Sequence, residues 1–422
     1  MPGPLEGIRV VDLSSMLSGP WAADILGDQG ADVVKVEPPG IGDHVRLLPN
    51  RSGDLPAMFV NINRSKRSVT LNLKSDDGVA ALLRLYETAD VVVQNFRPGV
   101  VDRLGIGYED ARRVNPRVVY LSISGFGEVG PYAGRRVYDP VVQALSGLTT
   151  IQAGSDEARP RLIRTVLPDK LTSVTAAQAV TAALLARERG GEGQHVRVSM
   201  LDSVMAFLWA SDMGAYTFRD KPMEPEKAAS FIDLIYETST DYMTVSTMRD
   251  AEWTAFCRAT GREDMIADPR FATAADRDAN VNERLEFIQS ELHRKPAEEW
   301  LELLPEYGVP CAPAMRRREL LDHPQVLASD ILLESEHPTA GPLRQTRTAA
   351  RFEGTVPGPP RGAPLIGQHN AEVLAEAGFS DAEIAALVAS GALGDEHTTS
   401  GTGAPVAVAA VADSADPTEA AS

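Results

Sequence analysis

The sequence predicts an α/β protein in which a large domain contains a mostly parallel sheet and a smaller domain interrupts the large one. Between residues 8 and 122, short apolar strand patterns alternate with amphipathic helix patterns. Such alternation is typical of a parallel sheet with helices on both faces. Near Lys221 the composition changes and mostly helical patterns follow, and strand patterns return near Leu327. We therefore expect the chain to leave the large domain and later re-enter it.

The individual elements follow from local patterns. Strands are expected at residues 8–13, 32–37, 68–73, 90–95 and 117–122, with helices at 20–30, 76–88 and 108–114 between them. A helix of about five turns follows Pro168 and ends at Gly190 and Gly191, before a strand at 194–200 and an apolar helix at 201–216. Met200, Met205 and Trp209 in this region are expected to be core residues. Later patterns predict a strand at 242–246 and helices at 251–260, 282–293, 297–304, 371–377 and 381–390.

The domain boundaries are placed where the composition changes. We assign residues 1–220 to the first part of the large domain, 221–327 to a smaller α+β domain, and 328–393 to the return into the large domain. Residues 394–422 are rich in alanine, lack aromatic side chains and show no apolar period, which predicts a disordered tail. That tail is acidic, with Asp395, Glu396, Asp413, Asp416 and Glu419 and no lysine or arginine.

Charge and cysteine content exclude several classes of protein. The formal net charge of -18 and the absence of a basic stripe argue against a nucleic-acid partner. Cys257 and Cys311 have no CxxC spacing and no histidine cluster, so neither a disulfide framework nor a metal site is expected. No apolar run reaches the length of a membrane span, and no secretion signal is recognised at the N-terminus. A cytoplasmic protein without a membrane partner is the expectation.

A dinucleotide-binding fold is the first alternative that the opening strands suggest. Glu37 ends the second strand, where such folds carry an acid for the ribose. The first loop, Ser14 to Gly19, however, does not have the G-x-G-x-x-G spacing that lets a pyrophosphate lie against the backbone. The sequence therefore disfavours an NAD(P) dehydrogenase.

Asp169 lies where the long helix is expected to begin. We expect it to be the N-cap, where free backbone N–H groups and the helix dipole favour an ionised carboxylate. An ionised carboxylate is a competent nucleophile toward an activated acyl group. When this stretch is taken alone, a helix cap with no further role is the favoured interpretation, because Asp is among the preferred caps of any helix.

Several motifs in the same order resemble the family III CoA-transferases, which also include α-methylacyl-CoA racemase. Among them are VQNFRPG at 93–99 and the Pro168-Asp169 pair. The other matching segments are residues 9–13, 18–20, 30–38, 63–68, 71–74, 104–105, 124–127, 190–200, 268–271 and 308–310. The resemblance implies a Rossmann-like large domain and ring-like subunits interlocked as a homodimer. It also implies an acyl-CoA donor and a carboxylic acid acceptor as substrates, with coenzyme A bound as a substrate and not as a permanent cofactor.

The resemblance also implies roles for particular residues. Asp169 would attack the thioester and form an aspartyl acyl-enzyme anhydride. Tyr138 and Asp139 would belong to the substrate pocket. The positions implied for coenzyme A contacts are Ser15, Met16, Lys74, Asn95, Phe96, Arg97, Arg103 and Arg136. Of the basic residues, Arg97 and Arg103 follow a strand's carboxyl end, where phosphate pairing is favoured. Ser15-Met-Leu17 and Pro38 depart from the formyl-CoA branch, so formyl and oxalate specificity are not implied.

Two alternatives to CoA transfer are considered. The racemase branch abstracts a proton with a histidine followed by an aspartate, and here Tyr138 stands at the histidine position. A tyrosine with an ordinary pKa near 10 is a poor general base at neutral pH, so transfer is favoured over racemisation. A non-catalytic acyl-CoA-binding relative would keep the basic residues and lose Asp169, whereas this chain retains both.

Overall fold

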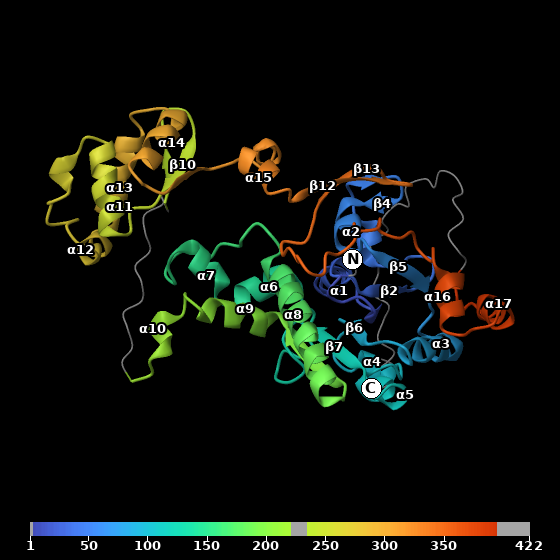
Figure 1. Cartoon of the computed structure of the whole chain (residues 1–422). Coiled ribbons are helices and arrows are strands. Elements are labelled where there is room, and N and C mark those ends of the chain that lie inside the picture. Colours follow the sequence, from blue (N-terminus) through green and yellow to red (C-terminus); the bar gives the residue numbers. More distant parts are fainter. Residues whose placement is uncertain (1–2, 221–233, 395–422) are drawn as a thin grey trace.

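The centre of the molecule is a six-stranded sheet in which every strand pair is parallel (Figure 1). The computed structural model describes residues 3–220 and 234–394. The strand order is β5-β2-β1-β6-β7-β8, with bounds Lys66–Thr70, Asp32–Glu37, Arg9–Asp12, Val91–Gln94, Val119–Ser124 and Gln194–Ser199. This is the doubly wound order, in which the direction of winding reverses between β1 and β6. The prediction of an α/β protein with a mostly parallel Rossmann-like sheet is confirmed.

Helices cover both faces of this sheet because successive strand residues point to opposite sides. Val10 of β1 belongs to the core beneath α1 and α8, and Val11 belongs to the core on the other face. α1 spans Ser18–Asp28 and α8 spans Leu167–Gly190. The opposite face is covered by α3 (Asp76–Tyr86), α5 (Tyr108–Val114), α16 (Asn370–Glu376) and α17 (Asp381–Ala389). Both faces are therefore buried, as parallel sheets require.

Short elements connect the sheet to its helices. They are η1 (His44–Leu47), β3 (Arg51–Ser52), β4 (Leu55–Pro56), α2 (Ala57–Ile62), α4 (Val100–Arg103), α6 (Asp139–Leu145), α7 (Leu148–Ala153), α9 (Met200–Trp209) and α10 (Gly214–Thr217). Met200 is buried among residues of α6 and α9. The core prediction is wrong for Met205 and Trp209, which are 39% and 45% exposed, because they lie on the outer side of α9.

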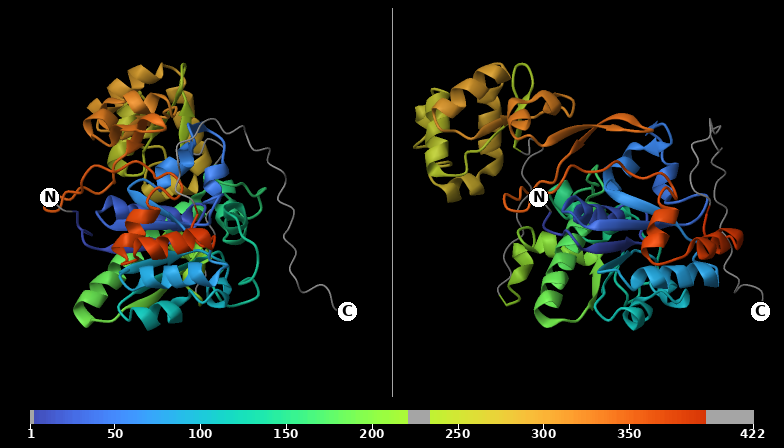
Figure 2. Two further views of the ribbon diagram at one scale, coloured as in Figure 1. Left: turned by 90° about the vertical axis from the view of Figure 1, so that its right-hand side faces the viewer. Right: turned by 45° about the vertical axis from the view of Figure 1, so that its right-hand side comes forward.

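Residues 235 to 313 form a smaller body that stands apart from the sheet (Figures 1 and 2). Its own core is built around Trp253, Phe256 and Trp300 and draws its buried residues from positions 236–309. An antiparallel sheet of β9 (Ile235–Glu237), β10 (Tyr242–Val245) and β11 (Cys311–Pro313) lies beside η2 (Glu263–Met265), α11 (Asp250–Ala259), α12 (Ala274–Ala279), α13 (Val281–Leu292) and α14 (Ala297–Glu306). Lys221, near which the sequence predicts that the chain leaves the large domain, lies outside the described residues.

The chain then returns to the first body through η3 (Glu319–Asp322), α15 (Pro324–Ala328) and the hairpin of β12 (Leu332–His337) and β13 (Gly341–Thr346). Ala340, Ala363 and Leu365 pack against Val45 and Phe59. Two side chains then cover the open edge of β5: His369 Nδ1 accepts the Ser68 N–H at 3.1 Å, and Asn370 Oδ1 accepts the Thr70 N–H at 2.9 Å. Covering an edge strand in this way blocks pairing with other chains. The predicted tail at 394–422 lies outside the described residues, except for Gly394.

Glu37 shows why this doubly wound sheet does not carry a ribose-binding acid. Its carboxylate accepts two hydrogen bonds from the Arg46 guanidinium, at 2.7 and 2.6 Å, and further bonds from the Asp43 N–H and the Ser68 hydroxyl. Glu37 is almost fully buried. The acid at the end of β2 is thus used to hold the following loop, and is not available to a ligand.

Of the helices in the described part of the chain, none combines the length and apolar character needed to cross a bilayer.

Candidate active site

A cavity of about 610 Å³ opens at the carboxyl ends of β1 and β6, where the winding of the sheet reverses. In doubly wound folds this is the position at which ligands bind. The starts of α1, α6 and α8 also reach it. The structure brings nine of the predicted site residues to its wall: Ser15, Met16, Asn95, Phe96, Arg97, Arg136, Tyr138, Asp139 and Asp169.

Asp169 occupies the first turn of α8, and the prediction that it is the N-cap is wrong. The N-cap is Val166, and Asp169 is the third residue of the helix. Pro168 explains the earlier start, because proline lacks an N–H and its fixed φ suits the first turn of a helix. The backbone N–H of Asp169, one of the unpaired donors of that turn, donates to Asp139 Oδ2 at 3.2 Å.

The Asp169 carboxylate faces the beginning of α1. It accepts hydrogen bonds from both the side chain and the backbone N–H of Ser18. The Ser173 hydroxyl bridges the two helices, since it lies 2.8 Å from the Ser18 carbonyl and 2.9 Å from the Asp169 carbonyl. The nucleophile candidate is thus held between the first turns of two helices, α1 and α8.

The charge state of Asp169 is set by burial as much as by helix ends. Burial, followed by the nearby Asp139 carboxylate, raises the pKa of Asp169 to about 6, and the two Ser18 hydrogen bonds oppose this rise. Burial likewise raises the pKa of Asp139, against the lowering effect of Gln143 and the Asp169 N–H. Asp169 is therefore mostly ionised at neutral pH, but it is more basic than an exposed aspartate and hence a better nucleophile.

Gln143 of α6 connects Asp139 to the chain that leads into α8. Its Nε2 donates to Asp139 Oδ1 at 2.6 Å and to the Thr165 carbonyl at 3.1 Å, and its Oε1 accepts the Ile163 N–H at 3.0 Å. Sequence reasoning did not identify Gln143 as a site residue, nor Ser18 and the cavity-lining His44 and Met58. Only Ser18 had a signal in the sequence, since it begins one of the family motifs; the other three are brought to the site by tertiary packing.

Asn95 joins the two strand ends that frame the cavity. Its Oδ1 accepts the Ser15 N–H at 2.9 Å and its Nδ2 donates to the Ser15 carbonyl at 2.7 Å. Arg97, two residues further on, is exposed at the cavity wall. In the described residues its guanidinium has no ion-pair partner, so it is available to an anion.

Lys74 and Arg103 are not brought to the cavity. Lys74 is exposed in the turn before α3, and Arg103 is exposed at the end of α4 with its guanidinium beside Gly99. The position just after a strand thus places Arg97 at the cavity wall, whereas Arg103, one helical turn further on, is not among the lining residues.

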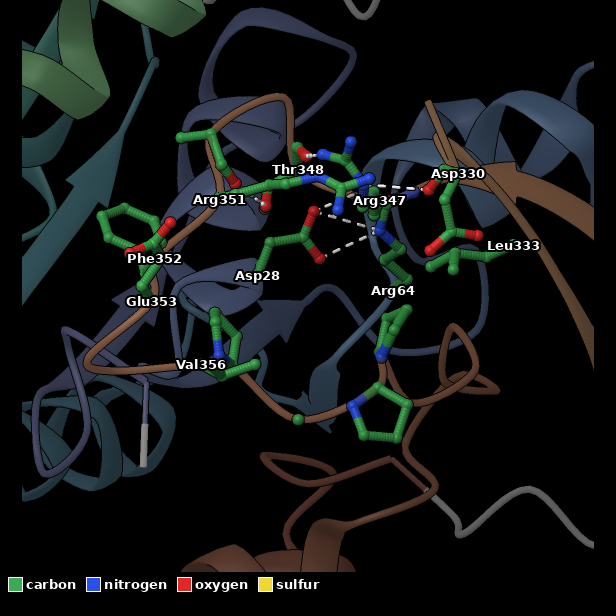
Figure 3. A pocket seen from close by; sticks show the side chains of 15 residues that line it. Asp28, Arg64, Asp330, Leu333, Arg347, Thr348, Arg351, Phe352, Glu353 and Val356 are labelled. Atoms are coloured by element: carbon green, nitrogen blue, oxygen red, sulfur yellow. Dashed lines mark hydrogen bonds and ion pairs between the residues drawn. The ribbon is translucent and has the colours of Figure 1, made fainter. Parts of the chain in front are cut away.

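A second cavity, of about 460 Å³, lies between α1 and the segment 347–360 (Figure 3). Its arginine side chains are already engaged. Arg64 Nε donates to Asp28 at 2.9 Å, and the Arg347 guanidinium donates to the backbone carbonyls of Asp330 at 2.9 Å and Ser329 at 3.0 Å. The arginines of this cavity are therefore less available to an anion than Arg97 in the first cavity. No cluster of metal-binding side chains occurs in residues 3–220 or 234–394.

Residues 5–370 match the family model described as CoA-transferase family III. The acetyl-CoA:oxalate CoA-transferase of Acetobacter aceti is 36% identical over 339 residues, which cover 79% of this chain and 86% of that protein. The human succinyl-CoA:glutarate CoA-transferase is 32% identical, over 94% of this chain and 91% of that protein. A crystal structure of Rv3272 from Mycobacterium tuberculosis superposes with a TM-score of 0.77 at 33% identity, over 88% of this chain and 99% of that one. The chain therefore belongs to CoA-transferase family III.

Proposed function

We propose that this CoA-transferase moves coenzyme A from an acyl-CoA thioester to a carboxylic acid through a covalent anhydride on Asp169. The observation that carries the proposal is the place of Asp169: its carboxylate lies at the cavity of the sheet's reversal point, held by Ser18 and with a pKa of about 6. The similar proteins from Acetobacter aceti and human are named for transfer between acyl-CoA and a dicarboxylate.

In the proposed reaction a carboxylate oxygen of Asp169 attacks the thioester carbonyl, the C–S bond breaks and coenzyme A leaves as the thiolate. A carboxylate oxygen of the acceptor acid then attacks the side-chain carbonyl carbon of Asp169 in this anhydride. The donor acid leaves as its carboxylate, and an anhydride between Asp169 and the acceptor remains. Finally the thiolate attacks the acceptor's acyl carbon, which forms the new thioester and regenerates the Asp169 carboxylate. Each step is an acyl transfer from one oxygen or sulfur atom to another, so no change of oxidation state occurs and no redox partner is needed. We infer that coenzyme A serves only as a substrate.

The cavity residues support distinct parts of this proposal. Arg97 and Arg136 would face the phosphates of coenzyme A, since a guanidinium pairs with phosphate oxygens in a fixed geometry. Asn95 and Phe96 would lie beside the nucleotide, with Ser15 and Met16 forming the loop opposite. Lys74 and Arg103 are less well supported, because neither borders the cavity.

Racemisation remains the alternative reaction. It needs a base of suitable pKa at the position of Tyr138, whose side chain is instead 70% exposed. Asp139, the next residue, has both carboxylate oxygens engaged by Gln143 and Asp169. These contacts favour a supporting role for Asp139 over proton abstraction. A purely binding protein is disfavoured because Asp169 is retained at the cavity.

We also propose an interlocked homodimer, built from a large domain interrupted by a small one. The separate core of residues 236–309 supports this division. The outer side of α8 to α10 exposes large apolar residues, including Val174, Phe207 and Tyr216. Apolar patches of this kind mark interaction surfaces, and a second copy of the chain is the proposed partner.

Trapping of the acyl-enzyme tests the reaction. The protein is incubated with acetyl-CoA or succinyl-CoA and hydroxylamine but no acceptor, and its peptides are analysed by mass spectrometry. We expect a hydroxamate on Asp169 that is absent from Asp169→Asn. Addition of oxalate or glutarate in place of hydroxylamine should yield the corresponding new thioester. Solvent deuterium entering the α-carbon of a 2-methylacyl-CoA, without hydroxamate at Asp169, would instead establish racemisation.

A further inference from the structure

The loop between β1 and α1 contains an unusual backbone conformation at the cavity wall. Met16 has a φ of 69°, in the left-handed region that side chains other than glycine rarely adopt. Such a conformation persists only where surrounding contacts enforce it, and it occurs often at functional sites. Met16 borders the cavity, and two residues later Ser18 donates to the Asp169 carboxylate.

Asp43 holds Met16 from behind the wall. Its Oδ1 accepts the Met16 N–H at 3.0 Å and the Val45 N–H at 3.0 Å, while Oδ2 lies 2.9 Å from Lys35 Nζ. The side chains of Lys35 and Asp43 are 0% and 1% exposed. Neither residue borders the cavity, so both act on it through the backbone alone.

Lys35 also donates to the Ser14 carbonyl at 2.9 Å. Together with the two bonds between Asn95 and Ser15, this contact means that residues 14, 15 and 16 are each fixed by a different side chain. Three supports on consecutive residues leave the loop little freedom. The conformation of Met16 and the direction in which α1 starts are therefore set by Lys35 of β2, Asp43 of the loop after β2, and Asn95, which follows β6.

The buried carboxylates around Lys35 favour its protonated form. Burial alone would lower the pKa of Lys35, but Asp43, Asp12 and Glu37 outweigh it and raise that pKa. Asp12 lies 3.8 Å from Lys35 Nζ and 2.8 Å from Lys66 Nζ, and Glu37 is paired with Arg46. Breaking one partner of such a network leaves an uncompensated buried charge. Both members of a pair must therefore be replaced together in any test.

We propose that Lys35 and Asp43 are positioning residues for the transfer reaction, because they hold Met16 in its left-handed conformation and thereby aim the Ser18 donors at Asp169. This inference rests on the proposed role of Asp169 as nucleophile. A merely structural pair would affect stability alone. A positioning pair also affects how readily Asp169 ionises and reacts, since the Ser18 hydrogen bonds favour the ionised carboxylate.

The test compares Lys35→Met/Asp43→Ala with the same variant carrying Met16→Gly. We expect the double variant to lower kcat about 10- to 100-fold, as misplaced catalytic groups do, and to move the acid limb of the kcat profile to higher pH. Glycine reaches positive φ without strain, so Met16→Gly should recover much of kcat and return the acid limb. The inference is wrong if the double variant keeps the wild-type acid limb, or if Met16→Gly recovers nothing.

Two further measurements keep the result interpretable. Arg262→Gln/Glu291→Gln removes a comparable ion pair of 2.8 Å in the smaller body and should lower the Tm without moving the acid limb. If the double variant does not fold, Met16→Val replaces it, because a branched side chain disfavours positive φ; a Met16→Val kcat equal to that of Met16→Gly would overturn the inference. Hydroxamate at Asp169 of the wild type decides the proposed function separately from either outcome.

Discussion

Asp139 Oδ2 accepts the backbone N–H of Asp169 at 3.2 Å, so one carboxylate fixes the position of another. The contact has two opposite effects on the start of α8. Asp139 satisfies a donor at the start of α8, but its negative charge also raises the pKa of Asp169. Paired carboxylates with shifted pKa values are a feature of sites that carry out proton or acyl chemistry.

A substitution of Asp139 should therefore distinguish the effect of its negative charge on Asp169 from the effect of its hydrogen bonds on stability. In Asp139→Asn the negative charge is gone, so the pKa of Asp169 should fall from about 6 and the acid limb of kcat/KM should move to lower pH. The amide has one oxygen for the two donors Gln143 and Asp169, so the free energy of unfolding should fall by about 1 kcal/mol. The exposed Asp278→Asn serves as the control, and an acid limb moving upward would contradict the role given to Asp139.

Asp169→Asn should lose transfer and gain stability. The native carboxyl has a pKa raised from 3.8 to about 6, so it binds its proton more tightly than in the unfolded chain. In the wild type, the contribution of this carboxyl to the free energy of unfolding is therefore fully present below about pH 4 and is lost as the pH rises through about 6. Removing the charge should raise the free energy of unfolding by about 1–3 kcal/mol at pH 8, and hardly at pH 4. Denaturant titrations at both pH values measure this, and a less stable variant at pH 8 would refute it.

Arg97 and Arg103 provide a matched pair for coenzyme A binding. Both are exposed and lie six positions apart, but only Arg97 borders the cavity. Arg97→Gln should weaken coenzyme A binding about fivefold, equivalent to about 1 kcal/mol, and should reduce the dependence of affinity on salt. Arg103→Gln should have a smaller effect on both. Calorimetry at two salt concentrations is the measurement, and equal effects of the two substitutions would show that the cavity does not discriminate between them.

The interlocked homodimer should have a mass that does not change on dilution. Threaded subunits separate only if one of them opens its fold, so stability and assembly should be inseparable. Light scattering at micromolar concentration and mass photometry at nanomolar concentration should both give twice the mass of the chain. An active monomer in either measurement would rule out this assembly.

Local sequence patterns predicted much of the fold. The range 32–37 coincides with β2 and 108–114 with α5, because alternating valines and clear helix signals are local properties. The predicted N-cap at Asp169 was wrong because Pro168 lies within the first turn, so the helix begins at Leu167 and Val166 is the N-cap. The helix α2 was not predicted, and the β12–β13 hairpin was predicted only as strand patterns returning near Leu327, since these segments share a core that includes residues far apart in the sequence.

The sequence by itself determined the alternation that makes a doubly wound sheet, the family motifs and the identity of Asp169 as the nucleophile candidate. Tertiary structure decided which charged residues reach the cavity, since Arg97 and Arg103 share a strand end but only one borders it. It also decided that Glu37 is paired with Arg46 and that burial raises the pKa of Asp169 to about 6. The physical reason is that backbone patterns depend on near neighbours, whereas burial and charge pairing depend on residues that only folding brings together.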